Sequence, residues 1–543
     1  MKLSKSFIGL IIVSLVFYLY ATNSFSIFQS NSALEIVDFS IESSPNKIDI
    51  PSNPFRNPYY GDLHVHTKYS FDAYIFGVTA TPYDAYKFAT GRAIKHPLGF
   101  DMKLREPLDF YAVTDHGFYM GMIENYADTS SKMSKNEWTI PMHNLNRPEN
   151  VTVESTGERA DLFSSVVRQA IVIPHPWWHP NYIGAWLTNN IQLALKSFDY
   201  DVHKSAWADV ANAAEEFNDP GKFTTFIGYE FTTSTDVEGG NLHRNVIFNS
   251  SNAPIRPWTR IDSINPEDLW TWMDNLRDKG VDSLAMPHNS NGSNGQMFEV
   301  ETFRGNPINE EYAEKRMRNE PVVEMTQVKG TSDTHPLLSP DDEWADFEIM
   351  DKRVGSRPPT YSMPQGGYVR DAYLRGLTLD WEGRGNPYKF GLIGSSDTHT
   401  GAGAYDENNY WSKVGVLDGT DMGRGSVPLS QDRINQLTQY SIDFNQPVST
   451  KQIEGKTYAD VGFDQWSASG LAVAWAEENT RDSIFQAFKR KETFATTGTR
   501  MAVRFFAGFD MESIDLNSED MVEDAYAKGL TMGADLFLSL IHI

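Results

Sequence analysis

Two histidines stand two positions apart near the start of the chain, in residues 61–66, which read Gly-Asp-Leu-His-Val-His. Side chains alternate across an extended strand, so His64 and His66 point to the same face and Val65 to the other. Two imidazoles on one face form a metal-chelating geometry. The chain has no cysteine. Any metal must therefore be held by His, Asp or Glu, and disulfides, iron–sulfur clusters and thiol nucleophiles are excluded.

Metal-binding residue types recur at the ends of later apolar runs. Asp115-His116 ends the run from 108, a glutamate ends 227–230, and a histidine ends 284–288. A histidine opens 243–248, and Asp and His again stand two apart after 390–394. If these runs are strands of one barrel, their carboxyl ends meet and the side chains converge. The strand-end residues that would converge with the first pair are His116, Glu230, His243, His288, Asp397 and His399.

The elements that must position these residues are short strands alternating with helices. We expect strands at 61–66, 108–115, 223–231, 244–248, 283–288, 321–328 and 389–396. Thr81-Pro82 opens a helix over 83–90, since Pro is favoured at the first helical position. Further helices are expected at 266–280 and at 479–491, where acids come early and lysines late. This alternation predicts an α/β fold with a parallel sheet or barrel.

The chain divides into an N-terminal leader, a tether and one large domain. Residues 1–26 carry Lys2 and Lys5 before an apolar run, which is typical of a signal peptide; an uncleaved membrane anchor is the alternative. Residues 27–57 are polar and Pro-rich, and we interpret them as a tether. Residues 58–543 are expected to form a single elaborated barrel, with insertions at about 120–222 and 400–475 that pack over one end and shape a pocket. An exported protein, periplasmic or extracellular, is predicted.

The overall charge restricts the partners. Lys and Arg number 47 against 72 Asp and Glu, a formal charge of −25. Nucleic acids and anionic membranes require clustered basic residues, so we expect neither as a partner, beyond a membrane anchor at the N-terminus. With 40% hydrophobic residues the chain can bury a substantial core.

The motifs resemble those of the polymerase-and-histidinol-phosphatase (PHP) superfamily. The matching patterns are His-x-His-Thr-x-x-Ser-x-Asp at 64–72, Thr-Asp-His at 114–116, a strand-end glutamate, later histidines, and Ser-Asp-x-His at 396–399. Residues 59–500 also resemble an uncharacterised family of exported bacterial proteins that adjoins this superfamily, through 61–66 and Ala-Thr-Thr-Gly-Thr-Arg at 495–500. The resemblance implies a PHP-like distorted (β/α)7 barrel with large insertions, and a site of two or three zinc, manganese or iron ions that hydrolyses phosphoesters.

The resemblance also implies a ligand set, position by position. One metal would be held by two histidines, a glutamate and an aspartate; the glutamate would bridge to a second metal with two more histidines; an aspartate and two histidines would hold a third. A bridging hydroxide held by Glu230 and Asp397 would attack phosphorus. In the order of the three metals, the implied ligands are His64, His66, Glu230 and Asp397; Glu230, His243 and His288; and Asp72, His116 and His399.

Charge and neighbouring residues favour a small phosphorylated substrate. Three carboxylates, three divalent ions and one hydroxide leave about +2 in the pocket, which suits a phosphate group. Arg244, Lys68 and Asn289 are candidate substrate contacts. We expect Asp62 and Asp115 to fix the outer ring nitrogen of His64 or His116.

Two other functions stay open. An amidohydrolase-like enzyme would cleave C–N or C–O bonds on a similar metal barrel, but such enzymes usually place a lysine among the ligands, and no strand-end lysine stands out. A non-catalytic protein that binds a metal or anion at the cell surface is the second alternative. The tetrapeptide Ser-Asp-Thr-His also occurs at 332–335. We favour the copy at 396–399 because an apolar run delivers it directly to a strand end.

Overall fold

The structure is a computed structural model that describes residues 33–41, 50–170, 198–234, 239–353, 360–444, 450–460, 465–466, 469–509 and 511–536. The predicted leader, 1–26, lies outside these residues, as do residues 171–197 of the first predicted insertion. None of the helices in the described part of the chain is long and apolar enough to cross a membrane.

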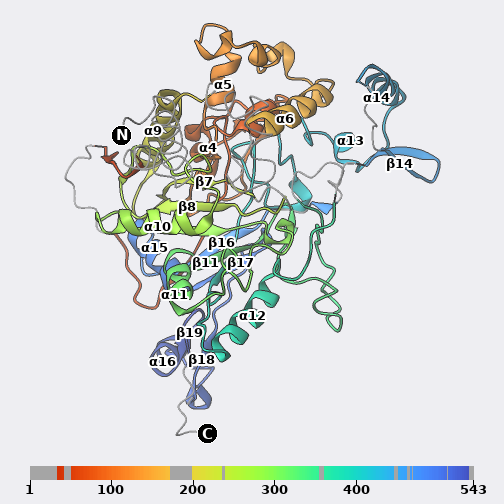
Figure 1. Ribbon diagram of the computed structural model, residues 1–543. Helices are drawn as coiled ribbons and strands as arrows, with labels where there is room; N and C mark the ends of the chain where they lie inside the picture. The colour runs from red at the N-terminus through yellow and green to blue at the C-terminus, as the bar shows by residue number, and fades with distance from the viewer. Residues whose placement is uncertain are drawn as a thin grey trace, which may run out of the picture.

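A five-stranded mixed sheet lies near the centre of the molecule (Figure 1). Its order is β17-β16-β2-β5-β6; the three strands β2, β5 and β6 run parallel, whereas β16 is antiparallel to both of its neighbours. Strands from the two ends of the sequence therefore lie side by side. The strands are β2 (Asn57–Asp62), β5 (Phe110–Tyr111), β6 (Thr224–Thr225), β16 (Leu471–Ala476) and β17 (Thr493–Thr496).

Two three-stranded sheets flank the central one. In the order β10-β8-β7 each strand is antiparallel to its neighbour, and in the order β12-β11-β13 the pair β11 and β13 is parallel. Isolated parallel bridges join the sheets just beyond their strand ends, at His116–Glu230 and Val65–Thr398. These strands are β7 (Ile227–Phe231), β8 (Arg244–Phe248), β10 (Ser283–Pro287), β11 (Val322–Gln327), β12 (Gly330–Thr331) and β13 (Gly391–Gly394).

The mixed α/β fold is confirmed, and the predicted strand order is corrected. Among the described residues the strands form separate sheets and close no barrel. The parallel order holds for β2-β5-β6 but is wrong for β7-β8-β10. The physical reason is the connection between β7 and β8: its described residues contain no helix, and a strand can run parallel to its predecessor only after a long crossover.

Three expected helices are present, two with the predicted starts and the third, α15, starting two residues later than predicted. α4 (Pro82–Ala89) begins with a capping box in which Thr81 and Asp84 each bond the backbone N–H of the other. α10 (Pro266–Arg277) and α15 (Arg481–Lys489) follow the predicted ranges closely. The other helices outside the two insertions are α3 (Phe71–Ile75), α11 (Glu310–Asn319), α12 (Val369–Trp381) and α16 (Met521–Lys528).

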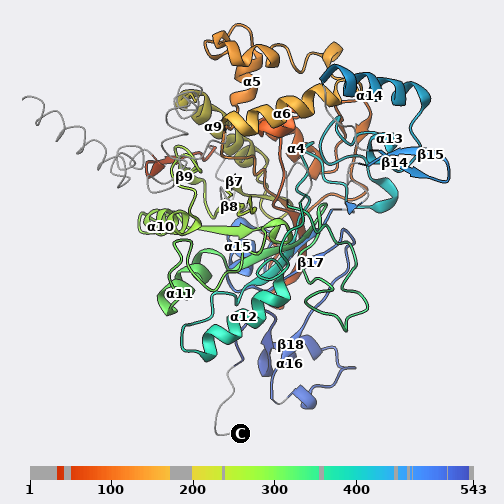
Figure 2. The ribbon, with the colours of Figure 1, turned by 45° about the vertical axis from the view of Figure 1, so that its right-hand side comes forward.

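Both predicted insertions carry structure of their own, and most of it gathers at the upper end of the molecule (Figures 1 and 2). The first lines a cavity of about 750 Å³ together with Tyr69 and Tyr74, which precede it in the chain. The first holds α5 (Met122–Ala127), α6 (Thr156–Ala170) and α9 (Tyr200–Phe217), and the second α13 (Asp421–Arg424), α14 (Gln431–Phe444), β14 (Thr450–Ile453) and β15 (Lys456–Ala459).

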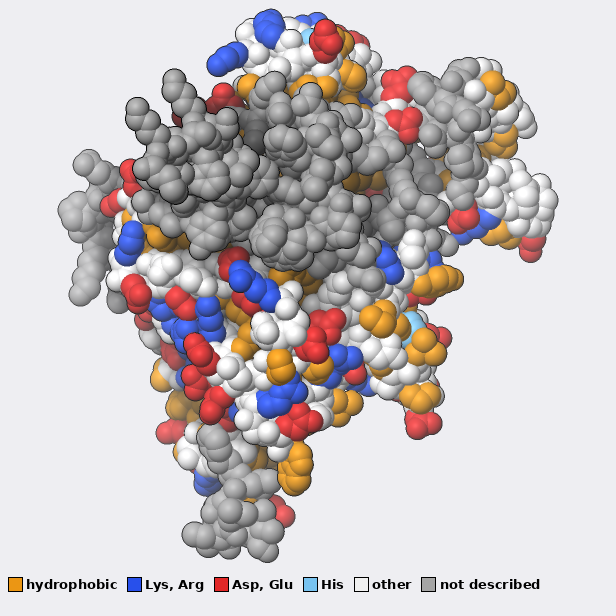
Figure 3. All heavy atoms as spheres, viewed as in Figure 1, with side chains coloured by type: hydrophobic (Ala, Val, Ile, Leu, Met, Phe, Trp, Pro, Cys, Tyr) orange, Lys and Arg blue, Asp and Glu red, His pale blue; other side chains and the backbone are white. Residues whose placement is uncertain are grey.

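Small two-stranded sheets complete the fold. In the predicted tether, β1 (Ile36–Asp38) pairs antiparallel with β9 (Asn252–Pro254). The pairs β3 (Ile94–Lys95) with β4 (Asp101–Met102) and β18 (Phe506–Ala507) with β19 (Leu530–Thr531) are also antiparallel. On the face drawn in Figure 3, acidic and basic side chains of the described residues are interspersed, with no broad field of one sign.

Candidate metal centre

The loop that follows β2 carries the first two candidate ligands into the interior. Leu63 and Val65 pack into two hydrophobic clusters, so His64 and His66 face the opposite side, and all four are buried. The predicted strand 61–66 ends earlier than expected, at Asp62. Beyond it the loop stays extended because the His66 N–H donates to Thr398 O at 2.8 Å. The alternation of side chains therefore persists past the strand.

Glu230, at the end of β7, is the centre of the cluster. Its Oε2 lies 3.4 Å from His64 Nε2 and 3.3 Å from His66 Nε2. Its Oε1 lies 2.6 Å from His243 Nδ1 and 3.7 Å from His288 Nε2. The same Oε1 also lies 3.2 Å from His116 Nδ1. The two oxygens of this carboxylate thus face different imidazoles, two at Oε2 and three at Oε1, which is the arrangement of a ligand that could bridge two cations.

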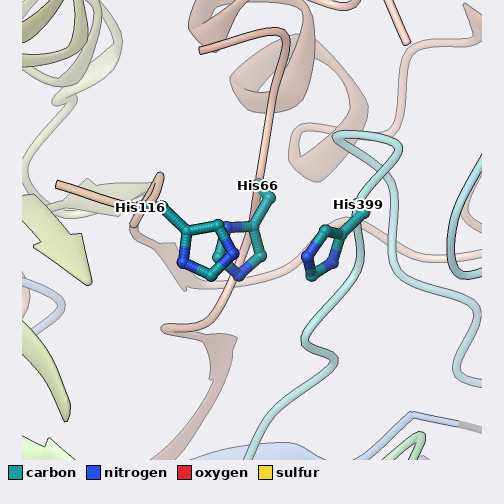
Figure 4. Close-up of side chains that lie close together, drawn as sticks. All are labelled: His66, His116 and His399. Atoms are coloured by element: carbon teal, nitrogen blue, oxygen red, sulfur yellow. The ribbon is translucent and has the colours of Figure 1, made fainter. Parts of the chain in front are cut away.

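A third group forms around Asp72, in α3. Asp72 Oδ2 lies 2.8 Å from His399 Nε2 and 3.2 Å from His116 Nε2. Figure 4 shows these two histidines on either side of His66, whose ring centroid lies 4.0 Å from that of His399 and 4.4 Å from that of His116. His66 can therefore join this group as well as that of His64 and Asp397.

Asp397 follows β13 in a left-handed backbone conformation, with φ of 54°. Few residues other than glycine adopt this conformation, although Asp and Asn do so more readily than most. Asp397 Oδ1 lies 3.4 Å from His64 Nε2 and 3.5 Å from His66 Nε2. The structure thus brings all nine sequence-predicted ligand residues into one contiguous cluster.

The direction of β8 explains how His243 reaches this cluster. His243 stands at the start of a strand, whereas the other candidate histidines stand after strand ends. Because β8 runs antiparallel to β7 and β10, its start lies beside the ends of both, and Arg244 pairs with Phe231 and Pro287. An all-parallel sheet would have placed His243 at the opposite edge from Glu230.

Unpaired buried atoms test whether the cluster fits metal ions. His64 Nε2, His66 Nε2 and both ring nitrogens of His288 are buried without a hydrogen-bond partner. Buried polar atoms normally have partners. Imidazole nitrogens and carboxylate oxygens are ligands that zinc, manganese and iron accept. Among the described residues there are four groups of three such side chains, and within each group the ligand atoms lie within 4.8 Å of one another. The donor set therefore fits divalent metal ions.

The charges of the cluster point the same way. Burial opposes ionisation of Glu230, but His116 and His243 hold its pKa well below the ordinary value. Burial likewise opposes protonation of His64 and His116, yet nearby carboxylates raise the pKa of each to about 10. The carboxylates of the cluster thus favour positive charge at these two imidazoles, and divalent cations could supply that charge in place of their protons.

Outer contacts orient the imidazoles toward the centre. His64 Nδ1 lies 2.9 Å from Glu324 Oε2, and His66 Nδ1 lies 2.8 Å from Ser70 Oγ. Each histidine thus directs Nε2 inward, as the partner of the other ring nitrogen fixes the tautomer. Glu324, in the middle of β11, was not predicted; the only signal was a carboxylate inside an apolar run.

The expected roles of Asp62 and Asp115 are wrong. Asp62 accepts hydrogen bonds from the backbone N–H groups of His64 and Ser396, and burial raises its pKa to about 6. Asp115 accepts from the N–H and the hydroxyl of Thr67. Both carboxylates hold the loops that carry the ligands instead of the imidazole rings, because their oxygens are taken up by N–H and O–H donors of neighbouring loops, including Tyr405 at Asp62 and Ser70 at Asp115.

Of the three predicted substrate contacts, only Asn289 lies at the cluster. Arg244 forms a buried ion pair with Glu320 at 2.8 Å, and Lys68 pairs with Glu124 at 2.8 Å, so both point to partners outside the cluster. Asn289 lies at the cluster, where its Oδ1 accepts from Lys329 Nζ at 3.1 Å.

Two lysines that the sequence did not predict contact Asp397. Lys329 Nζ bonds Asp397 Oδ2, and Lys413 Nζ lies 3.2 Å from Asp397 Oδ1. Lys413 comes from the second insertion, whereas Lys329 stands two residues after β11. The expectation that no lysine follows a strand end at the site is therefore wrong. The second copy of the tetrapeptide, with His335, contributes to none of the metal-binding groups found among the described residues.

Comparisons with known proteins add a family but no function. The model of a family described as Protein of unknown function (DUF3604) matches residues 53–540, a range that includes all the candidate ligands. No curated protein and no solved structure matches the chain.

Proposed function

We propose that this chain, which belongs to the family described as protein of unknown function (DUF3604), is a metal-dependent hydrolase, and specifically a phosphoesterase. The observation that carries the proposal is the position of Glu230, whose two oxygens face different imidazoles: His64 and His66 at Oε2, and His116, His243 and His288 at Oε1. A carboxylate so placed can bridge two cations, and paired metal ions are the usual device for phosphoester hydrolysis.

The cluster would hold two or three zinc, manganese or iron ions. His64, His66 and Asp397 would share one ion with Glu230, and His243 and His288 a second. Asp72 with His116 and His399 would hold the third. When bound, such ions polarise the phosphoryl group and lower the pKa of water, so that no protein nucleophile is needed.

The chain's own groups would orient these ligands and restrict water. Glu324 and Ser70 hold the first two histidines with Nε2 inward. The ligands at the centre are almost fully buried, and the most exposed side chains of the cluster are His243 and Asp72. We infer that substrate approaches from their side.

The PHP-like barrel and export remain part of this proposal. The resemblance of 64–72 and 396–399 to PHP motifs supports a distorted version of that barrel, built from sheets that meet at the Val65–Thr398 and His116–Glu230 bridges. The basic and apolar pattern of residues 1–26 supports a periplasmic or extracellular location.

One observation favours the amidohydrolase-like alternative. Lys329 follows β11 and contacts Asp397, and enzymes of that type use a lysine among their ligands. A neutral amide or lactone would then be the substrate. A protein that only binds a metal or an anion is the remaining alternative, and any turnover lost with the metal ligands excludes it.

Elemental analysis with a substrate panel tests the proposal. The purified protein is reconstituted with manganese or zinc, its metal content is measured, and phosphomonoesters, phosphodiesters and amides are assayed. We expect at least two metals per chain and phosphoester turnover. His399→Ala should abolish turnover, and His335→Ala, the same residue in the duplicated tetrapeptide, serves as the matched control. Fewer than two metals per chain, or turnover of amides alone, contradicts the proposal.

A further inference from the structure

Lys329 is a cation at the edge of the candidate metal centre. Its Nζ bonds Asp397 Oδ2 and donates to Asn289 Oδ1 at 3.1 Å. The side chain of Lys329 is 13% exposed and that of Asp397 is 2% exposed. Lys329 therefore stands between the buried ligands and solvent, whereas its carboxylate partner belongs to the interior.

Asp397 already has a second cation. Lys413 Nζ lies 3.2 Å from Asp397 Oδ1 and 2.9 Å from His399 Nδ1, and its side chain is only 2% exposed. Two ammonium groups thus share one carboxylate. Lys413 is enclosed and must stay with it. Lys329 is the cation that can leave, because the long lysine side chain is flexible and its end is partly in solvent.

Asn289 provides an unpaired donor next to Lys329. Its backbone is left-handed, with φ of 51°, and its Nδ2 is buried without a hydrogen-bond partner. It directly follows His288, a candidate ligand. Its Oδ1 is used by Lys329, so the unpaired atom is the donor half of the amide. A partly exposed ammonium beside an amide N–H₂ that has no acceptor forms a site for oxygen atoms that carry negative charge.

We infer that Lys329 and Asn289 bind the anionic end of the substrate, and that the substrate of this site is a phosphate ester dianion. This inference rests on the proposed function and adds the charge of the substrate to it. With a divalent cation at Asp397, the carboxylate would no longer require Lys329 as its counter-charge. The ammonium would then be available to phosphate oxygens, to which Asn289 Nδ2 would add a hydrogen bond. A neutral amide or lactone would leave both donors unpaired.

Direct phosphate binding tests this inference. Inorganic phosphate is titrated calorimetrically into the full-length, manganese-loaded protein. Lys329→Met should weaken phosphate binding about tenfold or more, since a charge-assisted hydrogen bond is lost. Lys329→Arg keeps the charge and should retain most of the affinity. Asn289→Asp introduces a like charge and should weaken binding at least as much. Lys352→Met removes a lysine whose ammonium pairs with Asp351 and serves as the control.

Manganese affinity is the second readout, and it requires no turnover. Removal of a positive charge from the ligand cluster should leave manganese binding unchanged or make it tighter in Lys329→Met. Weaker manganese binding would mean that Lys329 supports the ligands instead of the substrate, and would overturn the inference. Phosphate affinity within about twofold of wild type in Lys329→Met would also overturn it.

The two proposals fail in different ways. If the loaded protein hydrolyses phosphomonoesters and Lys329→Met leaves their kcat/KM unchanged, the inference is wrong and the proposed function stands. If the protein binds phosphate through Lys329 but turns over no phosphoester, the proposed function is wrong and the site binds anions only.

Discussion

Glu324 determines the orientation of the most connected histidine in the cluster. It lies in the middle of β11, buried, and its Oε2 stands 2.9 Å from His64 Nδ1. A negative partner on the outer nitrogen makes the inner nitrogen a stronger ligand, because it stabilises positive charge on the ring. This contact fixes His64 Nε2 in its position beside the carboxylates of Glu230 and Asp397.

Replacement of Glu324 should therefore weaken metal binding while it preserves shape. Glu324→Gln can still accept the hydrogen bond from His64 but loses the charge, and we expect manganese or zinc affinity to fall about 10- to 100-fold. Competition with a chromophoric chelator measures this change. Glu301→Gln, on the surface, is the control. Affinity equal to that of wild type would show that Glu324 has no effect on the ligand.

At the scale of single residues, the sequence predicted which side chains lie together but predicted their surroundings poorly. Eight of the nine candidate ligands stand next to expected strands, whereas Asp72 and the division of the set among the metals came from the resemblance to the PHP motifs. Glu324 and Lys413 were missed because a glutamate in an apolar run, or a lysine in a long insertion, carries no local sign of what it faces. Asp62 and Asp115 were assigned to the wrong partners because backbone N–H groups compete for carboxylates.

At the scale of elements, a neutral histidine of α9, His203, connects this helix to the loop that follows His116. His203 donates from Nε2 to Gly117 O at 2.8 Å, and its Nδ1 is buried without a partner. Burial lowers the pKa of His203 to about 4. Protonation would place an uncompensated charge in the interior, so acid should loosen this contact.

The stability of the protein should fall on the acid side for this reason. The folded pKa of His203 lies below its unfolded value of 6.5, so its contribution is complete above pH 6.5 and is lost as pH falls toward 4. At about 1.4 kcal/mol per pKa unit, the loss approaches about 3 kcal/mol. His203→Gln keeps a donor without a titrating ring.

Urea denaturation at pH 7 and at pH 4.5 measures this effect. We expect the difference in unfolding free energy between the two values to be smaller in His203→Gln than in wild type. His143→Gln, which changes a histidine of the same insertion that is not fully buried, should behave as wild type does. An unchanged difference in His203→Gln would contradict the assignment.

Element order was predictable and strand direction was not. Helix α4 and helix α10 start where their capping residues predict, because caps act within one turn. The direction of β8 depends on its whole connection from β7, for which apolar periodicity gives no information. His243 nevertheless lies beside Glu230, as predicted. Because β8 runs antiparallel to β7, the start of β8 lies at the same edge of the sheet as the end of β7.

At the scale of the whole molecule, the candidate ligands join parts of the chain that are far apart in sequence. They extend from His64, after β2, to His399, after β13, and they meet β7, β8 and β10 on the way. Metal binding should therefore stabilise the entire domain. Free metal at about 100 times its dissociation constant adds about 2.7 kcal/mol.

Thermal unfolding with and without a chelator measures this stabilisation. We expect the Tm of the metal-loaded protein to fall by a few degrees on chelation. His399→Ala should lose most of this difference, and His335→Ala should keep it. A chelator-insensitive Tm in a protein shown to bind metal would mean that the ions do not tie the strands together.

The large-scale organisation was predicted only in outline. The two insertions at about 120–222 and 400–475 were recognised because segments of that length cannot be simple connections. The sequence of the second insertion gave no indication that its Lys413 contacts Asp397. Contacts between segments so distant in sequence depend on the packing of the whole chain.

The pairing of β2 with β16 has a consequence for synthesis. One edge of β2 pairs with residues 472–476, so that edge has no partner until more than four hundred further residues have been made. At about 5 to 20 residues per second, this takes roughly 20 to 80 seconds. During that interval the nascent chain presents an open strand edge, and we expect it to depend on a holding chaperone until its last strands emerge.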